Sequence, residues 1–198
     1  MPERGGDVVE RGGGVLAALE LSPVQAAAPQ SFGGDVAAAW RAKAVERESN
    51  RLLGEYRSKG YRLTPKLAQQ ISEAAVEHGI EPELAFGLVR AESSFRNEST
   101  SRVGAIGLTQ LMPPTAAWME PSVTRTQLRD PETNLRIGFK YLAYPMEKYD
   151  GDEKLARLAY NRGPGTVDRA LRRGRSPDNG YADFVHGNEN HGHRLFTR

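Results

Sequence analysis

Glu92 is the residue of this sequence best placed to act as an acid near neutral pH. It follows an apolar helical stripe that includes Leu88 and Val89, and it stands three residues before Phe95. A carboxyl group among apolar side chains loses hydration, and this loss raises its pKa towards the range that a general acid needs. A glutamate near a helix end is more often an exposed surface residue, so Glu92 alone predicts little.

A loop rich in small residues follows, and it suits the binding of a polar ligand. Its characteristic residues are Ser101, Gly104, Ala105, Gly107, Gln110 and Met112. Small residues let a backbone approach a sugar closely, while hydroxyl and amide groups orient the polar atoms of the ligand. We expect Gln110 to begin a helix. The alternative interpretation is a glycine-rich turn that only connects two helices.

The chain that positions these residues has the pattern of a series of helices. Thr64, Glu81 and Asp130 each precede a proline, which is typical of a helix start. Asp152 predicts one more start, and Pro145 is expected to kink or end the helix that begins after Asp130. Few segments alternate between apolar and polar residues, so we predict an all-α domain.

The composition divides the chain into a folded part and two tails. Residues 1–34 are rich in Gly, Ala and Pro, and we expect a disordered tail or a degenerate signal region there. The helical pattern over residues 35–60 predicts an accessory helix, and residues 64–184 are expected to form the main domain. We expect residues 185–198 to be a frayed C-terminal tail.

Charge and cysteine content exclude several classes of protein. Lys and Arg total 27 and Asp and Glu total 25, which gives a formal net charge of +2 with both signs interspersed. This balance argues against a dedicated nucleic-acid-binding protein. The absence of cysteine excludes disulfides, thiolate metal sites and thiol nucleophiles. No apolar run approaches the ~20 residues that a membrane-spanning helix requires.

Three ordered blocks of sequence resemble the signature of the soluble lytic transglycosylase (SLT) domain. The first block comprises Glu92, Ser93, Phe95, Ser101, Gly104, Ala105, Gly107, Leu108, Gln110, Met112, Pro113, Thr115 and Ala116. The second comprises Asp130, Pro131, Asn134, Leu135, Gly138, Tyr141 and Leu142, and the third Ala159, Tyr160, Asn161, Gly163, Pro164 and Gly165. Each block is weak by itself, but their common order within residues 64–172 makes the resemblance specific.

The resemblance implies a lysozyme-like all-α fold with a long cleft for the glycan strand of peptidoglycan. It gives Glu92 the role of catalytic acid and base, and it implies neither a metal nor an organic cofactor. The residues that match substrate-binding positions of this cleft are Ser101, Gln110, Met112, Tyr160 and Asn161. The resemblance therefore implies a peptidoglycan lytic transglycosylase.

The family reaction cleaves the β-1,4 bond between N-acetylmuramic acid (MurNAc) and N-acetylglucosamine (GlcNAc) with one carboxyl group. The resemblance implies that Glu92 protonates the glycosidic oxygen and then accepts the proton of the MurNAc C6 hydroxyl, which attacks C1 and leaves a 1,6-anhydro end. The acetamido group replaces the second carboxylate of an ordinary glycosidase. Because peptidoglycan lies outside the cytoplasmic membrane, we expect a periplasmic or envelope protein, and we expect a monomer.

The chain departs from the family pattern at several positions. Thr109 replaces a usual methionine, and we expect it on a helix surface that tolerates the change. Arg162 replaces a small residue, and it is expected to narrow the cleft or to contact a peptide stem or carboxylate. Pro145 interrupts a helix that is normally continuous in the family. Tyr181, in the C-terminal part of the chain, is an aromatic residue that could return to the cleft.

Two other functions stay open on the sequence. A hydrolase on the same fold would need a second carboxylate to activate water, and Glu98 and Asp130 are the candidates. Asp130 has a simpler explanation as an N-cap, and Glu98 stands in a polar loop. The other function is a non-catalytic glycan-binding module, because fold does not fix function and the chain differs from the family at Thr109 and Arg162.

Overall fold

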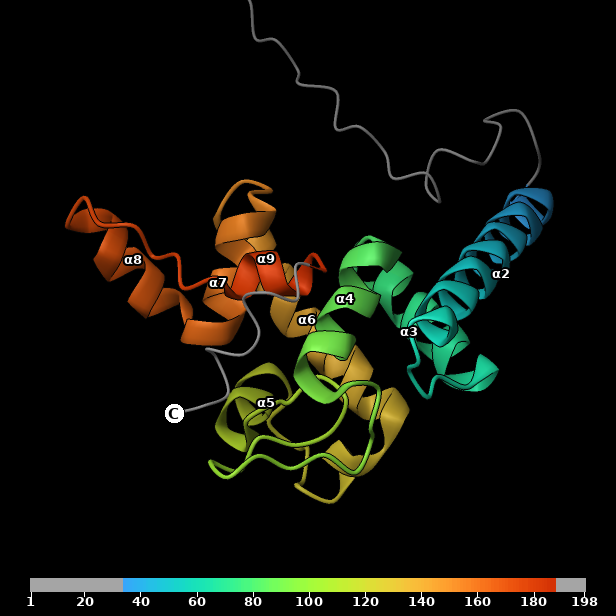
Figure 1. The fold of residues 1–198 in the computed structure, drawn as a ribbon, viewed down its shortest axis with the longest axis horizontal. Coiled ribbons are helices and arrows are strands. Elements are labelled where there is room, and N and C mark those ends of the chain that lie inside the picture. Colours follow the sequence, from blue (N-terminus) through green and yellow to red (C-terminus); the bar gives the residue numbers. More distant parts are fainter. Residues whose placement is uncertain (1–33, 188–198) are drawn as a thin grey trace, which may run out of the picture.

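Helices make up the regular structure of the part of the chain that the computed structural model describes, residues 34–187 (Figure 1). This confirms the predicted all-α class. The expected tail or signal region at the N-terminus and nearly all of the expected C-terminal tail lie outside the described residues.

The helices follow one another with short connections, apart from one long loop between the third and fourth. In chain order they are α2 (Gly34–Ser58), α3 (Pro65–Glu77), α4 (Pro82–Ser93), α5 (Pro113–Met119), the 3-10 helix η1 (Gln127–Arg129), α6 (Pro131–Lys148), α7 (Glu153–Arg162), α8 (Pro164–Arg172) and α9 (Tyr181–Val185).

The predicted helix starts are confirmed where a cap or a proline marks them. A side-chain oxygen of the N-cap residue accepts a hydrogen bond from the backbone N–H three residues later, at 3.2 Å for Thr64 and 2.9 Å for both Asp130 and Asp152. Each bond satisfies one of the N–H groups that the first turn of a helix leaves unpaired. α4 begins at the proline after Glu81 without a side-chain cap.

The core surrounds α4, which lies in the middle of the fold between α3 and the α7–α9 side (Figure 1). Phe86 and Leu88 on α4 are fully buried, together with Leu135 and Phe139 on α6 and Leu158 on α7. Each such side chain contributes about 1.5–3 kcal/mol of hydrophobic stabilisation relative to an exposed one. The helix that carries Glu92 is therefore anchored from several sides. None of the described helices is long and apolar enough to cross a membrane.

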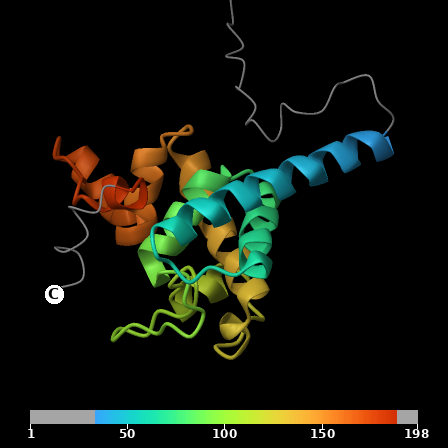
Figure 2. The same cartoon turned by 45° about the vertical axis from the view of Figure 1, so that its right-hand side comes forward.

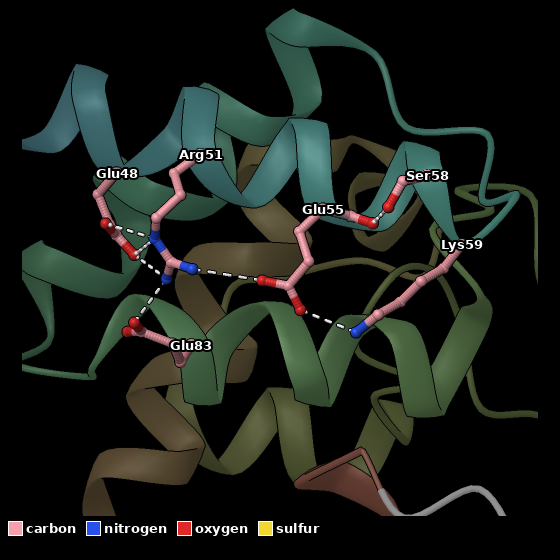
Figure 3. Close-up of polar contacts among 6 residues, drawn as sticks. All are labelled: Glu48, Arg51, Glu55, Ser58, Lys59 and Glu83. Atoms are coloured by element: carbon pink, nitrogen blue, oxygen red, sulfur yellow. Dashed lines mark hydrogen bonds and ion pairs between the residues drawn. The ribbon is translucent and has the colours of Figure 1, made fainter.

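The N-terminal part of α2 projects from the other helices, whereas its C-terminal part packs against them (Figure 2). Leu52, Leu53 and Tyr56 are buried in that C-terminal part. The exposed guanidinium of Arg51 reaches from α2 to the carboxylate of Glu83 on α4 at 2.6 Å, as Figure 3 shows. Exposed ion pairs contribute about 0–1 kcal/mol, so the buried apolar residues hold α2 in place.

Of the two expected effects of Pro145, the end of the helix is wrong, because α6 continues to Lys148, and the kink stays a prediction. Proline has no N–H, so the bond to the carbonyl group four residues earlier, at Tyr141, is missing. Pro145 stands close to the C-terminal end of α6 and its ring is buried. One lost hydrogen bond near a helix end is offset by this apolar contact.

Candidate active site

Glu92 lies in the last turn of α4, at the start of a sharp turn of the backbone. Ser94 and Phe95 have φ angles of 52° and 62°, which residues other than glycine rarely adopt. The ring of Phe95 is buried against Tyr56 and Tyr61, with centroid distances of 5.0 and 5.6 Å. This aromatic packing compensates the unfavourable backbone conformation and fixes the point at which α4 ends.

The carboxyl group of Glu92 is partly buried and bonded to one tyrosine. Burial raises the pKa of Glu92 to about 7, and the hydrogen bond that the Tyr181 hydroxyl donates to its Oε1 acts in the opposite direction. Burial and the charge of Glu92 raise the pKa of Tyr181 well above its usual value, so Tyr181 stays a neutral donor. Glu92 can therefore hold a proton near neutral pH and release it.

Helix α9 carries Tyr181 and is fastened to α4 near Glu92. Arg90 donates a hydrogen bond to the carbonyl oxygen of Phe184, and its guanidinium lies 4.7 Å from the centre of the Phe184 ring. Gly87 permits the close approach of the two helices, because a Cβ atom there would overlap the carbonyl oxygen of Val185. These contacts hold the Tyr181 hydroxyl at the carboxyl group of Glu92.

The segment before Tyr181 is bonded to the end of α7, which includes a predicted site residue. Asn161 accepts a hydrogen bond from the side-chain amide of Asn179 at 3.0 Å. Arg162 donates to the carbonyl oxygen of Pro177 at 2.5 Å. Asn161 is therefore linked to the segment that carries Tyr181, and the unusual Arg162 has a partner within the chain.

Two predicted substrate-binding residues, Gln110 and Ser101, hold the loop that follows α4. The amide nitrogen of Gln110 donates to the carbonyl oxygens of Ser99 and Gly107 at 3.2 and 2.9 Å. The Ser101 hydroxyl accepts a hydrogen bond from the backbone N–H of Ala105 at 3.0 Å. Gln110 has a φ of 46° and does not begin a helix, which corrects our expectation. Its backbone belongs to a tight turn.

Asn134 on α6 anchors the same loop from inside the protein. Its side chain is fully buried, donates to the carbonyl oxygens of Ile106 and Leu128, and accepts from the backbone N–H and the hydroxyl of Thr109, all at 2.9 Å. Thr109 is fully buried and packs on Gly138, where a Cβ atom would overlap it. Thr109 was expected on a helix surface, and that expectation is wrong.

Tyr160 on α7 is bonded to this anchored loop. Its hydroxyl donates to the carbonyl oxygen of Thr109 at 2.8 Å. Burial, and after it the charge of Glu92, raises the pKa of Tyr160 well above its usual value. Met112 lies at the N-cap of α5, with 36% of its surface exposed. The substrate-binding roles of Ser101, Gln110, Met112, Tyr160 and Asn161 stay predictions.

Two important contacts are not evident from the sequence. Asn134 belongs to the second resembling block, yet nothing local indicates that its amide holds a loop 25 residues earlier. Tyr181 bonds a carboxyl group 89 residues away, and its aromatic type was the only signal. Among residues 34–187, no group of three or more His, Asp or Glu side chains is arranged to hold a metal ion.

The chain is similar to several known proteins. A family model described as a transglycosylase SLT domain matches residues 69–181. A soluble lytic murein transglycosylase of Escherichia coli is 39% identical over 89 residues, which are 42% of this chain and 14% of that protein. A transglycosylase of Enterobacteria phage PRD1 is 39% identical over 95 residues, 48% of this chain and 34% of that protein.

The fold is also similar to that of a solved structure. The lytic transglycosylase Slt of Pseudomonas aeruginosa superposes with a TM-score of 0.55 and 24% sequence identity, over 81% of this chain and 32% of that chain. At this identity the likeness concerns the fold alone. The chain thus spans about a third or less of the length of each of these relatives.

Proposed function

The protein belongs to the transglycosylase SLT domain family, whose model matches more than half of its 198 residues, and on this premise we propose that it is a peptidoglycan lytic transglycosylase. The observation that carries the proposal is the partly buried carboxyl group of Glu92 at the end of α4, which accepts a hydrogen bond from Tyr181 and whose pKa is raised to about 7 by burial. Its substrate would be the glycan strand, and its place of action the cell envelope.

The proposed reaction uses Glu92 twice. The protonated carboxyl group donates its proton to the glycosidic oxygen between MurNAc and GlcNAc, and the bond from this oxygen to C1 of MurNAc breaks. The resulting carboxylate accepts the proton of the C6 hydroxyl, whose oxygen forms the new bond to C1. The products are a 1,6-anhydro-MurNAc end and a free GlcNAc hydroxyl, and Glu92 regains its proton.

The geometry gives little support to the hydrolase alternative. A hydrolase of the inverting type holds water between two carboxyl groups about 6.5–9.5 Å apart. Asp130 is exposed and its Oδ2 accepts the N-cap bond from Thr133 at 2.9 Å, and Glu98 is exposed as well. Both candidate carboxylates therefore have the surroundings of surface groups.

Analysis of the soluble products tests the proposed reaction. Purified protein is incubated with isolated peptidoglycan sacculi, and the released fragments are identified by mass spectrometry. We expect 1,6-anhydromuropeptides, which are lighter by one water molecule than hydrolysis products. Reducing-end products would identify a hydrolase, and binding of sacculi without any release would identify a glycan-binding module.

The pH dependence of the reaction should report the pKa of Glu92. Because the first step needs the protonated carboxyl group, kcat/KM should fall about ten-fold per pH unit above a midpoint near 7. In Tyr181→Phe, the loss of a bond that favours the charged form should raise the pKa, so the midpoint should move to higher pH. Initial rates of muropeptide release across the pH range measure both.

Tyr149→Phe is a matched control for this shift. The Tyr149 hydroxyl also donates to a carboxylate, that of Asp168 at 2.9 Å, but this pair joins the end of α6 to α8. Its removal should leave the pH midpoint unchanged. An unchanged midpoint in Tyr181→Phe would mean that Tyr181 does not adjust the acid of the reaction.

A further inference from the structure

A row of aromatic side chains leads from the neighbourhood of Glu92 to the protein surface. Tyr160, whose hydroxyl bonds the loop after α4, packs on Tyr141 with a centroid distance of 5.1 Å. Tyr141 contacts Trp118 at 6.3 Å, and Trp118 contacts Tyr144 at 5.0 Å. The row therefore joins α7, α6 and α5 and is continuous with the candidate active site.

The two inner rings of the row are buried and the two outer rings are exposed. Tyr160 and Tyr141 are each only 8% exposed, whereas Tyr144 is 37% and Trp118 is 55% exposed. Tyr160 and Tyr141 therefore belong to the core, and the two outer rings are open to solvent. An exposed aromatic pair loses the stabilisation that burial would provide, and a ligand that covers it recovers that stabilisation.

The outer rings are held in place before any ligand arrives. Trp118 meets Tyr141 and Tyr144 at interplanar angles of 80° and 90°, which are favourable edge-to-face contacts. The C-terminal end of α5 is tied to α6, because Lys140 donates to the Met119 carbonyl oxygen at 3.1 Å. A fixed ring loses little conformational entropy when a ligand stacks on it.

The ion pair of Glu120 and Arg136 ties the same end of α5 to α6 with a distance of 2.7 Å. Both residues are partly exposed, and the exposed Lys140 stands one helical turn before Tyr144 on α6, so a charged group lies beside the aromatic pair. A surface that combines a fixed apolar ring with polar neighbours suits a ligand that has an apolar face and a polar rim.

We propose that Trp118 and Tyr144 form a subsite for one sugar ring of the glycan strand, separated from Glu92 by the rings of Tyr160 and Tyr141. A β-linked hexosamine ring presents an apolar face of C–H groups and a rim of hydroxyl and acetamido groups, which matches this surface. This inference rests on the proposed function, because it takes the glycan strand as the ligand.

The size of the aromatic pair also favours a sugar over a protein partner. A tryptophan and a tyrosine side chain together offer a few hundred Å², whereas a specific protein–protein interface buries about 1,200–2,000 Å² in total. The buried rings of Tyr160 and Tyr141 connect this exposed pair to the candidate active site through the core. Sugar rings held far from the broken bond contribute to binding the whole strand.

Tryptophan fluorescence can observe this subsite directly, because the chain contains only two tryptophans, Trp40 and Trp118. The protein with Glu92→Gln and Trp40→Phe has Trp118 as its single tryptophan and should bind glycan without turnover. It is titrated with glycan strands freed of their peptides by an amidase, and calorimetry measures the affinity in parallel. We expect a saturable change in Trp118 emission with the same affinity as the heat signal.

Substitution of Trp118 gives the second readout. In the same protein, Trp118→Ala should bind peptide-free strands about ten-fold more weakly, as expected for the loss of an aromatic anchor. Trp118→Tyr should restore most of the affinity, which a mere folding defect of the alanine variant would not predict. Leu171→Ala, at a 43% exposed apolar residue on α8, should bind like the parent.

The outcomes separate this proposal from the proposed function. Unchanged Trp118 emission while calorimetry records binding would overturn the subsite, as would equal affinity of Trp118→Ala and the parent. In either case the release of anhydromuropeptides by the protein with Glu92 would still support the proposed transglycosylase reaction. Strand binding at Trp118 without any product release by that protein would support the subsite and overturn the reaction.

Discussion

Replacing Glu92 with glutamine is expected to reduce the release of anhydromuropeptides from sacculi about a thousand-fold, the typical contribution of a general acid and base. Glutamine has nearly the same shape and can still accept the hydrogen bond from Tyr181. It has no acidic proton to donate to the glycosidic oxygen. Product release by the variant and the parent is compared by mass spectrometry at equal protein concentration.

Thermal melting of Glu92→Gln and of the parent shows whether the variant is folded. The pKa of Glu92 is raised from 4.5 to about 7 by burial, so its contribution to stability is fully present below about pH 4.5 and is lost as the pH rises through 7. Glu92→Gln removes this loss, and the variant should melt at a higher temperature than the parent at about pH 8. A stable variant with release within ten-fold of the parent would contradict the assignment of Glu92.

Asn134→Ala is expected to lower the free energy of unfolding by about 3–5 kcal/mol, the largest effect on stability that we predict. The change would leave the backbone N–H of Thr109 and the carbonyl oxygens of Ile106 and Leu128 buried without their partner. It would also leave a small cavity next to the fully buried side chain of Thr109. Urea-induced unfolding, followed by circular dichroism, measures the difference.

Asn50→Ala is the matched control for this prediction. Asn50 is exposed on α2, where alanine is a good helix former, so its replacement should change stability by less than about 0.5 kcal/mol. Equal stability of the two alanine variants would show that the network of Asn134 contributes nothing measurable. Release of muropeptides should also fall in Asn134→Ala, because Thr109 supports Tyr160.

The helices could be predicted because their signals are local. The caps are Thr64, Asp130 and Asp152, and a proline follows the first two. Each signal acts on the next turn of the chain, so it can be recognised without the tertiary structure. Pro145 does not end its helix, one of the two effects expected of it, because the cost of a proline depends on its position. Near the end of α6, where the ring is buried, the helix tolerates one missing hydrogen bond.

The loop after α4 shows why part of the site was beyond prediction. Gln110 and Thr109 were assigned to a helix from apolar spacing, but Asn134 supplies hydrogen bonds from 25 residues away and competes with helix formation. Glu92 was singled out by its place after an apolar helical stripe, and the resemblance to a family then gave Glu92 and Tyr160 their roles. The bond between Tyr181 and Glu92 depends on the packing of α9 on α4, and no spacing rule relates positions so far apart.

The pairing of Glu92 with Tyr181 has a consequence for biosynthesis. A ribosome makes the chain from its N-terminus, so Glu92 and its helix emerge well before the tyrosine 89 positions later. Until that last helix has been made and docked, the acid lacks its hydroxyl partner. A nascent or prematurely terminated chain that lacks α9 would therefore lack the hydrogen bond that lowers the pKa of the acid.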